Sequence, residues 1–258
     1  MREYLKEILK RKDLLRYLVM SGLKADNRDS YLGYLWWLLD PLLNVLVYYF
    51  VVVTILGRGG PDYPVFLVIG MVVWRWMNTT INSSAKSITR YSSIINQVYL
   101  PKAIFPMALT LTQMFNFMFG LVVIAIFLAI FGVIPTWLIV LLPLIIVVQM
   151  LFLLAVSLFL GYISVFIRDI DNVVKHTIRI FFYASPVIWE SSRFPERYDW
   201  LIAINPIAII LNAYRDVLMY HQMPNFLQLL IVGLCSLVAI GLLFRHYSKN
   251  EHKIIKAL

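Results

Sequence analysis

The sequence predicts an all-α membrane protein with six transmembrane helices, and three observations support this fold class. Of the 258 residues, 61% are hydrophobic and 14% are charged, whereas soluble domains usually carry about 25% charged residues. The 65 residues from Ala103 to Ile167 include no Asp, Glu, Lys, Arg or His. Further long apolar runs lie on both sides of this stretch. We therefore interpret the chain as one polytopic membrane domain.

The uncharged stretch predicts a helical hairpin. As one helix rising about 1.5 Å per residue it would be about 97 Å long, roughly three times the hydrocarbon core of a bilayer. Gly132 and Pro135 are its strongest breakers, so we expect spans at about 104–131 and 135–166. Basic residues flank both outer ends, which indicates that these ends face the cytoplasm. They are Lys86, Arg90 and Lys102 before the hairpin and Arg168, Lys175 and Arg179 after it.

The first 35 residues predict an amphipathic helix on the inner membrane surface. They contain eight Lys or Arg residues, and apolar residues recur at helical spacing between them. This pattern is typical of an interfacial helix, and an ordinary solvated helix is the alternative. Trp36 and Trp37 then lie where an aromatic belt would be expected, at the start of a first span at about 36–56.

A second span is expected at about 64–84, and it carries an arginine near its middle. A charge at that depth costs roughly 2.5–3.5 kcal/mol even on the cheaper insertion scales, so Arg75 should face protein, water or a ligand. Asp40, in the first span, is a possible partner. A structural ion pair and a contact with substrate are both open interpretations of Arg75.

The fifth expected span, at about 172–189, carries a polar stripe. Its members recur at steps of three or four residues and so share one helical face. They are Asn172, Lys175, His176, Arg179, Tyr183, Pro186 and Glu190. A basic stripe that leads into aromatic residues suits a lipid-linked phosphate or glycan. Cations that extend to the inner surface would explain Lys175 and His176 well, but Arg179 less well.

The remaining segments complete a six-span topology with both termini in the cytoplasm. Residues 91–101 predict a short cytoplasmic segment, and residues 226–244 predict the sixth span. Between spans five and six, residues 190–224 contain a 15-residue apolar run, Trp200–Tyr214, that Asn205 and Pro206 interrupt. Such a run is too short to span comfortably, so we expect re-entrant helices there.

The sequence does not predict catalysis by this chain alone. No G-x-x-x-x-G-K-[ST] motif is present, the four histidines form no metal-binding pair, and Cys235 has no disulfide partner. We therefore predict no catalytic residue, no metal site and no cofactor in the chain. The net charge of +9 is explained by cytoplasmic basic residues near anionic lipids, so no nucleic-acid partner is expected.

Motifs spread over about 190 residues resemble those of ABC-2 type export permeases for polysaccharides and teichoic acids. They are Lys24-x-x-x-Arg28-x-Ser30-x-Leu32-Gly33-x-Leu35-Trp36 with Asp40-Pro41-Leu42; Gly70-x-x-x-Trp74 with Ser93-Ile94-Ile95 and Leu100-Pro101; and Arg168-Asp169-Ile170 with Ser185-Pro186-Val187, Asn205-Pro206 and Tyr214-Arg215. The overall pattern is similar to wall teichoic acid translocation permeases in particular. Ala25-Asp26-Asn27 departs from it, because more basic residues are common there in the family.

The resemblance implies a homodimer assembled with two copies of a separate ATPase that binds ATP and magnesium. It also implies that the N-terminal helix and residues 91–101 dock on that ATPase and that re-entrant helices after Ser185 lie near an outer gate. The expected coupling residues are Ser93, Ile94, Ile95, Val98, Tyr99, Arg168 and Asp169.

These observations lead to the hypothesis of a plasma-membrane permease that moves an undecaprenyl-pyrophosphate-linked polymer, wall teichoic acid being the first candidate. We expect Lys24, Arg28, Lys175 and Arg179 to meet the lipid pyrophosphate. The expected substrate path consists of Tyr48, Tyr49, Trp74, Arg75, Arg179, Phe181, Tyr183 and Trp189. The alternatives are export of O-antigen, capsular polysaccharide or a drug, an integral membrane enzyme acting on lipid carriers, and a structural scaffold.

Overall fold

A computed structural model of the chain describes residues 2–25, 31, 33–55, 57, 60, 62–95, 100–167, 169–191, 197 and 199–258. Within these residues all regular secondary structure is helical, as the predicted fold class requires. The elements are α1 (Arg2–Lys10), α2 (Lys12–Ala25), η1 (Gly33–Leu35), α3 (Trp36–Tyr49), the π-helical η2 (Phe50–Ile55), α4 (Tyr63–Ser84), η3 (Thr89–Tyr91), α5 (Ser92–Ile95), α6 (Ile104–Ile130), η4 (Trp137–Leu141), α7 (Leu142–Phe166), α8 (Ile170–Ala184), α9 (Asp199–Ile204), α10 (Pro206–Leu218) and α11 (Phe226–Ala257).

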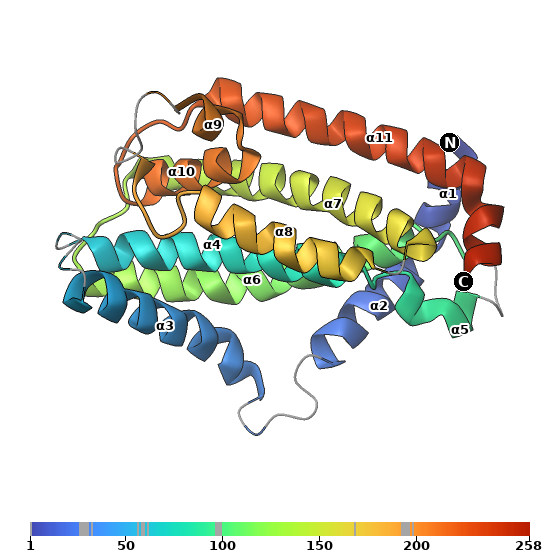
Figure 1. The fold of residues 1–258 in the computed structure, drawn as a ribbon, viewed down its shortest axis with the longest axis horizontal. Helices are drawn as coiled ribbons and strands as arrows, with labels where there is room; N and C mark the ends of the chain where they lie inside the picture. The colour runs from blue at the N-terminus through green and yellow to red at the C-terminus, as the bar shows by residue number, and fades with distance from the viewer. Residues whose placement is uncertain are drawn as a thin grey trace.

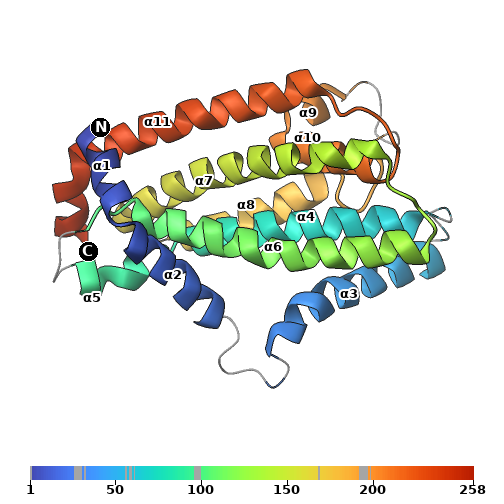
Figure 2. The ribbon, with the colours of Figure 1, turned by 180° about the vertical axis from the view of Figure 1, so that it is seen from behind.

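The long helices form an elongated bundle with distinct ends. Helices α3, α4, α6, α7, α8 and α11 run roughly along its long axis (Figure 1). Helices α1, α2 and α5 and both chain termini lie at one end, and α9 and α10 lie at the other, an arrangement that is also clear from behind (Figure 2). We refer to these as the terminal end and the α10 end.

Helix α4 is the centre of the bundle. It contacts α3, α6, α7, α8 and α10, and almost every residue from Tyr63 to Met77 is buried. A second apolar cluster fills the terminal end, where α1 and α2 meet the start of α6, the end of α7 and the last turns of α11. Within the amphipathic segment predicted at 1–35, residues 2–25 thus form two helices with a break at Arg11, and their inner face is packed against protein.

The longest uncharged stretch folds as a hairpin of α6 and α7. The turn between them contains Gly132, whose φ of +68° lies in the left-handed region that glycine adopts without strain. Pro135 follows, and the chain re-enters helix at Trp137. Helices α6 and α7 pack against each other and against α4, so this hairpin forms one wall of the bundle.

The expectation of six spans is not confirmed. Four described segments are long and apolar enough to cross a membrane: Tyr63–Ser84, Ile104–Ile130, Trp137–Phe166 and Phe226–Ala257. Near the first expected span, the apolar helix Leu39–Ile55 is shorter than the ~20 residues usually needed.

Helix α8 is shorter than the span expected at 172–189. Its 15 residues would extend about 22 Å, because an α-helix rises about 1.5 Å per residue. It ends at Ala184, and Ser185 is extended (φ −106°, ψ 151°), as the residue before a proline usually is. Pro186 and Glu190 therefore do not continue the helical stripe, which is a correction to the prediction from residue spacing.

Residues 199–218 form α9 and α10 with a break at Asn205. The Asn205 side chain accepts a hydrogen bond from the backbone N–H of Ile207 and so caps α10, and Pro206 occupies the first turn, where its missing N–H costs nothing. Helix α10 is largely buried and contacts α4, α7 and α11. The sixth expected span, 226–244, is part of a longer helix, α11, which bends at Asn250.

Candidate functional site

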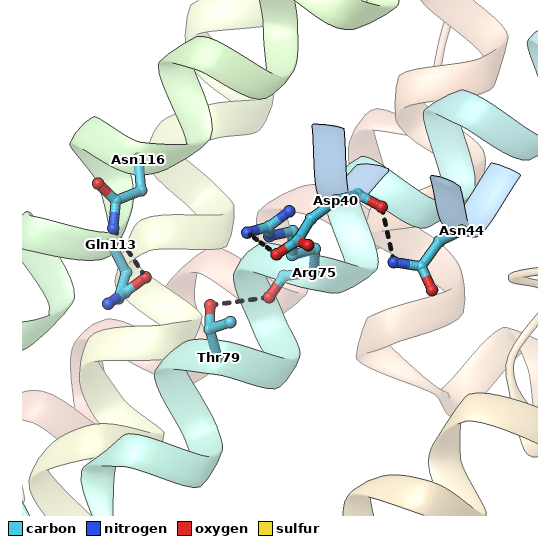
Figure 3. A network of polar contacts seen from close by, with 6 residues as sticks. All are labelled: Asp40, Asn44, Arg75, Thr79, Gln113 and Asn116. Carbon is cyan, nitrogen blue, oxygen red and sulfur yellow. Dashed lines mark hydrogen bonds and ion pairs between the residues drawn. The ribbon is translucent and has the colours of Figure 1, made fainter. Parts of the chain in front are cut away.

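A partly exposed ion pair joins α3 to α4. Arg75 Nη2 lies 2.9 Å from Asp40 Oδ2, and their side chains are 31% and 45% exposed. This confirms the pairing considered from the sequence. The pair lies in a polar network (Figure 3): Asn44 donates from Nδ2 to the Asp40 carbonyl, and the Thr79 hydroxyl donates to the Arg75 carbonyl.

A groove of about 720 Å³ extends from this ion pair toward α8. It is lined by polar and basic residues of three helices and by an aromatic wall. Among its lining residues are Asp40, Asn44 and Tyr48 of α3, Trp74, Arg75, Asn78 and Asn82 of α4, and Lys175, Arg179, Phe182 and Tyr183 of α8. Phe182 packs against the rings of Tyr48 and Trp74, with centroids 5.7 and 5.4 Å away. The groove therefore offers cations and aromatic faces to the same ligand.

A smaller cavity of about 320 Å³ lies on the opposite side of the ion pair, toward α6. Asp40 and Arg75 line both spaces, so the ion pair separates them. Gln113 and Asn116 of α6 approach the pair from this side (Figure 3) and are joined by a hydrogen bond of 3.3 Å. Arg75 Nη1 is buried and has no hydrogen-bond partner among the described residues, so this edge of the guanidinium can still donate.

The structure brings together six of the residues predicted for the path and for lipid binding. Tyr48, Trp74, Arg75, Lys175, Arg179 and Tyr183 all line the groove. Tyr49 and Phe181 are exposed outside it. Trp189 also lies outside it and donates from Nε1 to the Tyr183 carbonyl. Lys24 is exposed in the last turn of α2, and Arg28 lies outside the described residues.

A carboxylate at the base of α8 binds two lysines. Asp171 Oδ2 lies 2.7 Å from Lys175 Nζ and 3.2 Å from Lys86 Nζ, which follows the end of α4. The hydrogen bond from Lys175, followed by that from Lys86, lowers the pKa of Asp171. Because Lys175 lines the groove, Asp171 connects the groove to the segment between α4 and α5.

Comparison with known proteins adds sequence evidence to this geometry. The profile of the family "ABC-2 type transporter" matches residues 13–219. The chain belongs to the ABC-2 type transporter family. Three similar proteins are each named O-antigen export system permease protein RfbA. One, from Myxococcus xanthus, is 28% identical over 91% of both chains, and two from Klebsiella pneumoniae are 31% identical over 80% and 28% identical over 95% of both chains.

Membership of this family makes the chain the membrane component of an ABC transporter and not by itself an enzyme. It also implies an ATPase partner. Among the described residues, no three His, Cys, Asp or Glu side chains are grouped so that they could hold a metal. The relatives carry O-antigen export in their names, so the similarity to wall teichoic acid permeases in particular is not supported by them.

The residues predicted for ATPase coupling in this ABC-2 permease lie at the terminal end where the structure describes them. Ser93, Ile94 and Ile95 belong to α5, and Asp169 immediately precedes α8. Ile94 is 46% exposed, whereas Ile95 is 3% exposed and packs into the apolar cluster of the terminal end. A docking role would therefore fall to Ile94. Val98, Tyr99 and Arg168 lie outside the described residues.

Reasoning from the sequence missed Arg215 of α10 as a functional candidate. Its guanidinium is fully buried, donates to the carbonyls of Pro186 and Val187, and lies 3.5 Å from the centroid of the Phe66 ring. The segment after α8 is irregular, and its carbonyls need such partners inside a membrane domain. The residue spacing could have predicted a buried arginine, because Arg215 follows Leu211 and Ile207 at steps of four and so shares their apolar helical face.

Gly70 of α4 makes room for this arginine. A Cβ atom at position 70 would collide with Arg215 Nη2 and with the Val187 carbonyl oxygen. The close approach of α4, α10 and the segment after α8 therefore requires glycine at this position. Tyr63 reinforces the same junction by donating from its hydroxyl to the Ile188 carbonyl at 2.7 Å.

A second missed feature is a dry ion pair at the terminal end. Lys102 Nζ lies 3.4 Å from Glu251 Oε1, and the two side chains are 0% and 7% exposed. The backbone N–H of Lys102 also donates to Glu251 Oε1 at 3.3 Å. Glu251 directly follows the bend at Asn250, so the bend directs the last turns of α11 toward the start of α6.

Proposed function

We propose that this permease exports a polysaccharide carried on undecaprenyl pyrophosphate from the inner to the outer leaflet of the plasma membrane, driven by its ATPase partner. The observation that carries the proposal is the groove between α3, α4 and α8. It combines Arg75, Lys175 and Arg179 with the rings of Tyr48, Trp74 and Tyr183. Phosphates bind arginine and lysine through charge-assisted hydrogen bonds, and sugars can slide over aromatic faces.

The polymer proposed first is an O-antigen-like polysaccharide, because three relatives are named as O-antigen export permeases. Wall teichoic acid, the candidate favoured by the sequence motifs, is the second. The groove supports both, since each polymer combines sugars or polyols with a lipid-linked pyrophosphate. Complementation of strains that lack either exporter separates the two: we expect restored O-antigen at the cell surface, and restoration of teichoic acid export alone would overturn the first choice.

The proposed assembly is a homodimer with two ATPase subunits, which bind ATP and magnesium. Only Val174, Ile178 and Phe182 of α8 are buried, so most of this helix, including Lys175 and Arg179 of the groove and His176, is exposed in the single subunit. Cations are expensive against lipid, so a second subunit across α8 would enclose a polar path. In this assembly both termini and residues 91–101 face the cytoplasm, and 190–224 forms re-entrant helices at the outer side.

The test of the path is Arg179→Ala, with Arg245→Ala as the matched control. Arg245 is an exposed arginine of α11 that lines no part of the groove. One lost charge-assisted hydrogen bond is worth roughly 1.5 kcal/mol, or about tenfold, so surface polymer should fall about tenfold in the first variant and stay unchanged in the control. Membrane abundance and co-purification of the ATPase should be normal in both. Normal export by Arg179→Ala would remove α8 from the path.

A further inference from the structure

A third cavity, of about 510 Å³, lies at the terminal end between α2, the end of α4 with η3, and α6. It is separate from the groove, since none of the α8 residues and neither Asp40 nor Arg75 lines it. Ser83 and Gln113 line both this cavity and the smaller cavity beside Arg75. Its volume falls within the usual range of small-molecule sites, about 300–1,000 Å³.

One wall of this cavity is polar and basic. Lys86 and Arg90 line it together with Ser21, Ser83 and Thr89, each of which carries a hydroxyl. Within the described part of the chain, no ion pair is formed by Arg90 and no hydrogen bond by these three hydroxyls. The wall thus presents a cation and several donors that are available to a ligand rich in acceptor oxygens.

The charge of this wall is not neutralised by its surroundings. No Asp or Glu is among the residues that line the cavity. Lys86 contacts Asp171 at 3.2 Å, but the same carboxylate oxygen lies closer to Lys175, at 2.7 Å. One carboxylate between two ammonium groups leaves a positive charge beside Arg90, which favours an anion in the cavity.

Apolar side chains line the rest of the cavity. Leu18, Phe105 and Leu109 line it. On the outer side of α2, Tyr17 and Met20 are exposed, as expected for a helix that lies in the interface with its apolar side chains in lipid. In the proposed topology this places the cavity at the depth of the lipid headgroups, and its lining offers partners for both parts of a lipid, the phosphate and the acyl chain.

We propose that this cavity binds the phosphate of a membrane lipid, with Arg90 and Lys86 as the phosphate ligands and Leu18, Phe105 and Leu109 against the chain. The lipid is either an anionic phospholipid of the inner leaflet or a polyprenyl pyrophosphate. A zwitterionic phospholipid binds less well, because its cationic headgroup meets Arg90. The site does not depend on which polymer the permease exports, and its occupant would fix α2 to α4 and α6.

The test is native mass spectrometry of the full-length permease from nanodiscs of phosphatidylcholine with one added lipid. The added lipid is phosphatidylglycerol in one arm and undecaprenyl pyrophosphate in the other. The variant Lys86→Gln/Arg90→Gln is compared with Lys12→Gln/Lys249→Gln, which removes two exposed cations that do not line the cavity. We expect the fraction of permease carrying the added lipid to fall about tenfold in the first variant only.

Loss of retained phosphatidylglycerol would support the phospholipid as occupant, and loss of undecaprenyl pyrophosphate alone would support the lipid carrier. Equal retention of both added lipids by the two variants would overturn the proposal, as would equal retention of phosphatidylcholine by the wild type. If the double variant unfolds, Arg90→Gln alone is used, because it keeps the contact of Lys86 with Asp171. This single variant should also lower the fraction of permease that carries the added lipid. No polymer or ATP is present, so a failure here leaves the export proposal untouched.

Discussion

Two of the ion pairs, Arg75–Asp40 and Lys102–Glu251, differ in their surroundings more than in their geometry. Arg75 and Asp40 lie 2.9 Å apart with 31% and 45% of their side chains exposed, between two cavities. Lys102 and Glu251 lie 3.4 Å apart with 0% and 7% exposed, inside an apolar cluster. The first pair can exchange its partner for a ligand, whereas the second cannot do so without opening the terminal end. We therefore propose a role in transport for the first pair and a structural role for the second.

The largest expected effect comes from breaking the dry pair. Glu251→Leu removes the Glu251 carboxylate from the buried Lys102 ammonium, and breaking a buried ion pair on one side typically destabilises a protein by about 3–5 kcal/mol. The purified permease should melt well below the wild type or fail to accumulate. Lys102→Met/Glu251→Leu should recover most of the loss, because replacing both charges with apolar side chains is often neutral. A single variant as stable as the wild type would contradict the assignment.

A smaller loss is expected where α4 meets Arg215. Gly70→Ala forces the added methyl against Arg215 and the Val187 carbonyl, and overpacking of this kind costs about 1–3 kcal/mol. Gly241→Ala is the matched control, because nothing lies within 4 Å of a Cβ atom at that position of α11. Thermal unfolding in detergent should separate the two variants, and equal melting would show that the junction can relax.

Breaking the Arg75–Asp40 pair should change stability little and transport strongly, in contrast to breaking the Lys102–Glu251 pair. Arg75→Gln removes a half-exposed pair, and such pairs contribute about 0–1 kcal/mol to stability. The polymer at the cell surface should nevertheless fall about tenfold, because Arg75 lines both cavities. Export assays and melting curves on the same preparations test this. Normal export with strong destabilisation would make the pair structural.

The smallest effect is expected at Asp171. Asp171→Asn removes an i,i+4 contact with Lys175, which is worth a few tenths of a kcal/mol. The hydrogen bond from Lys175 lowers the pKa of Asp171 in the folded protein. The ionised Asp171 therefore contributes to stability above the pKa of an Asp in the unfolded chain, about 3.9, and this contribution is lost as the pH falls through the folded pKa. The difference in melting temperature between wild type and variant should therefore vanish in strong acid. A difference that grew on acidification would refute this linkage.

The sequence located features that depend on composition or on nearby residues. The hairpin of α6 and α7 follows from the absence of charge and from Gly132, and the partner of Arg75 could be anticipated because membrane arginines need one. The end of α8 could also have been predicted from Pro186. A proline disfavours the helical conformation of the residue before it by a local steric effect, and Ser185 is accordingly extended.

Features that join distant segments could not be predicted in this way. Lys102 and Glu251 are 149 residues apart, as are Phe66 and Arg215. Their pairing depends on how the helices pack, and a single sequence does not indicate which distant residues come into contact. Ile94 and Ile95 looked equivalent in the sequence, and only the packing of the terminal end buries one and exposes the other.

The bend at Asn250 has a consequence for biosynthesis. Tyr4 and Ile8 of α1 share an apolar cluster with Tyr247 and Ile254 of α11. Helix α1 leaves the ribosome first among the described helices, and α11 leaves it last. The nascent chain must therefore hold α1 at the membrane surface, without its final partners, until nearly all of the protein has been translated. Surveillance proteases would meet an open terminal end in any chain that stops before Glu251.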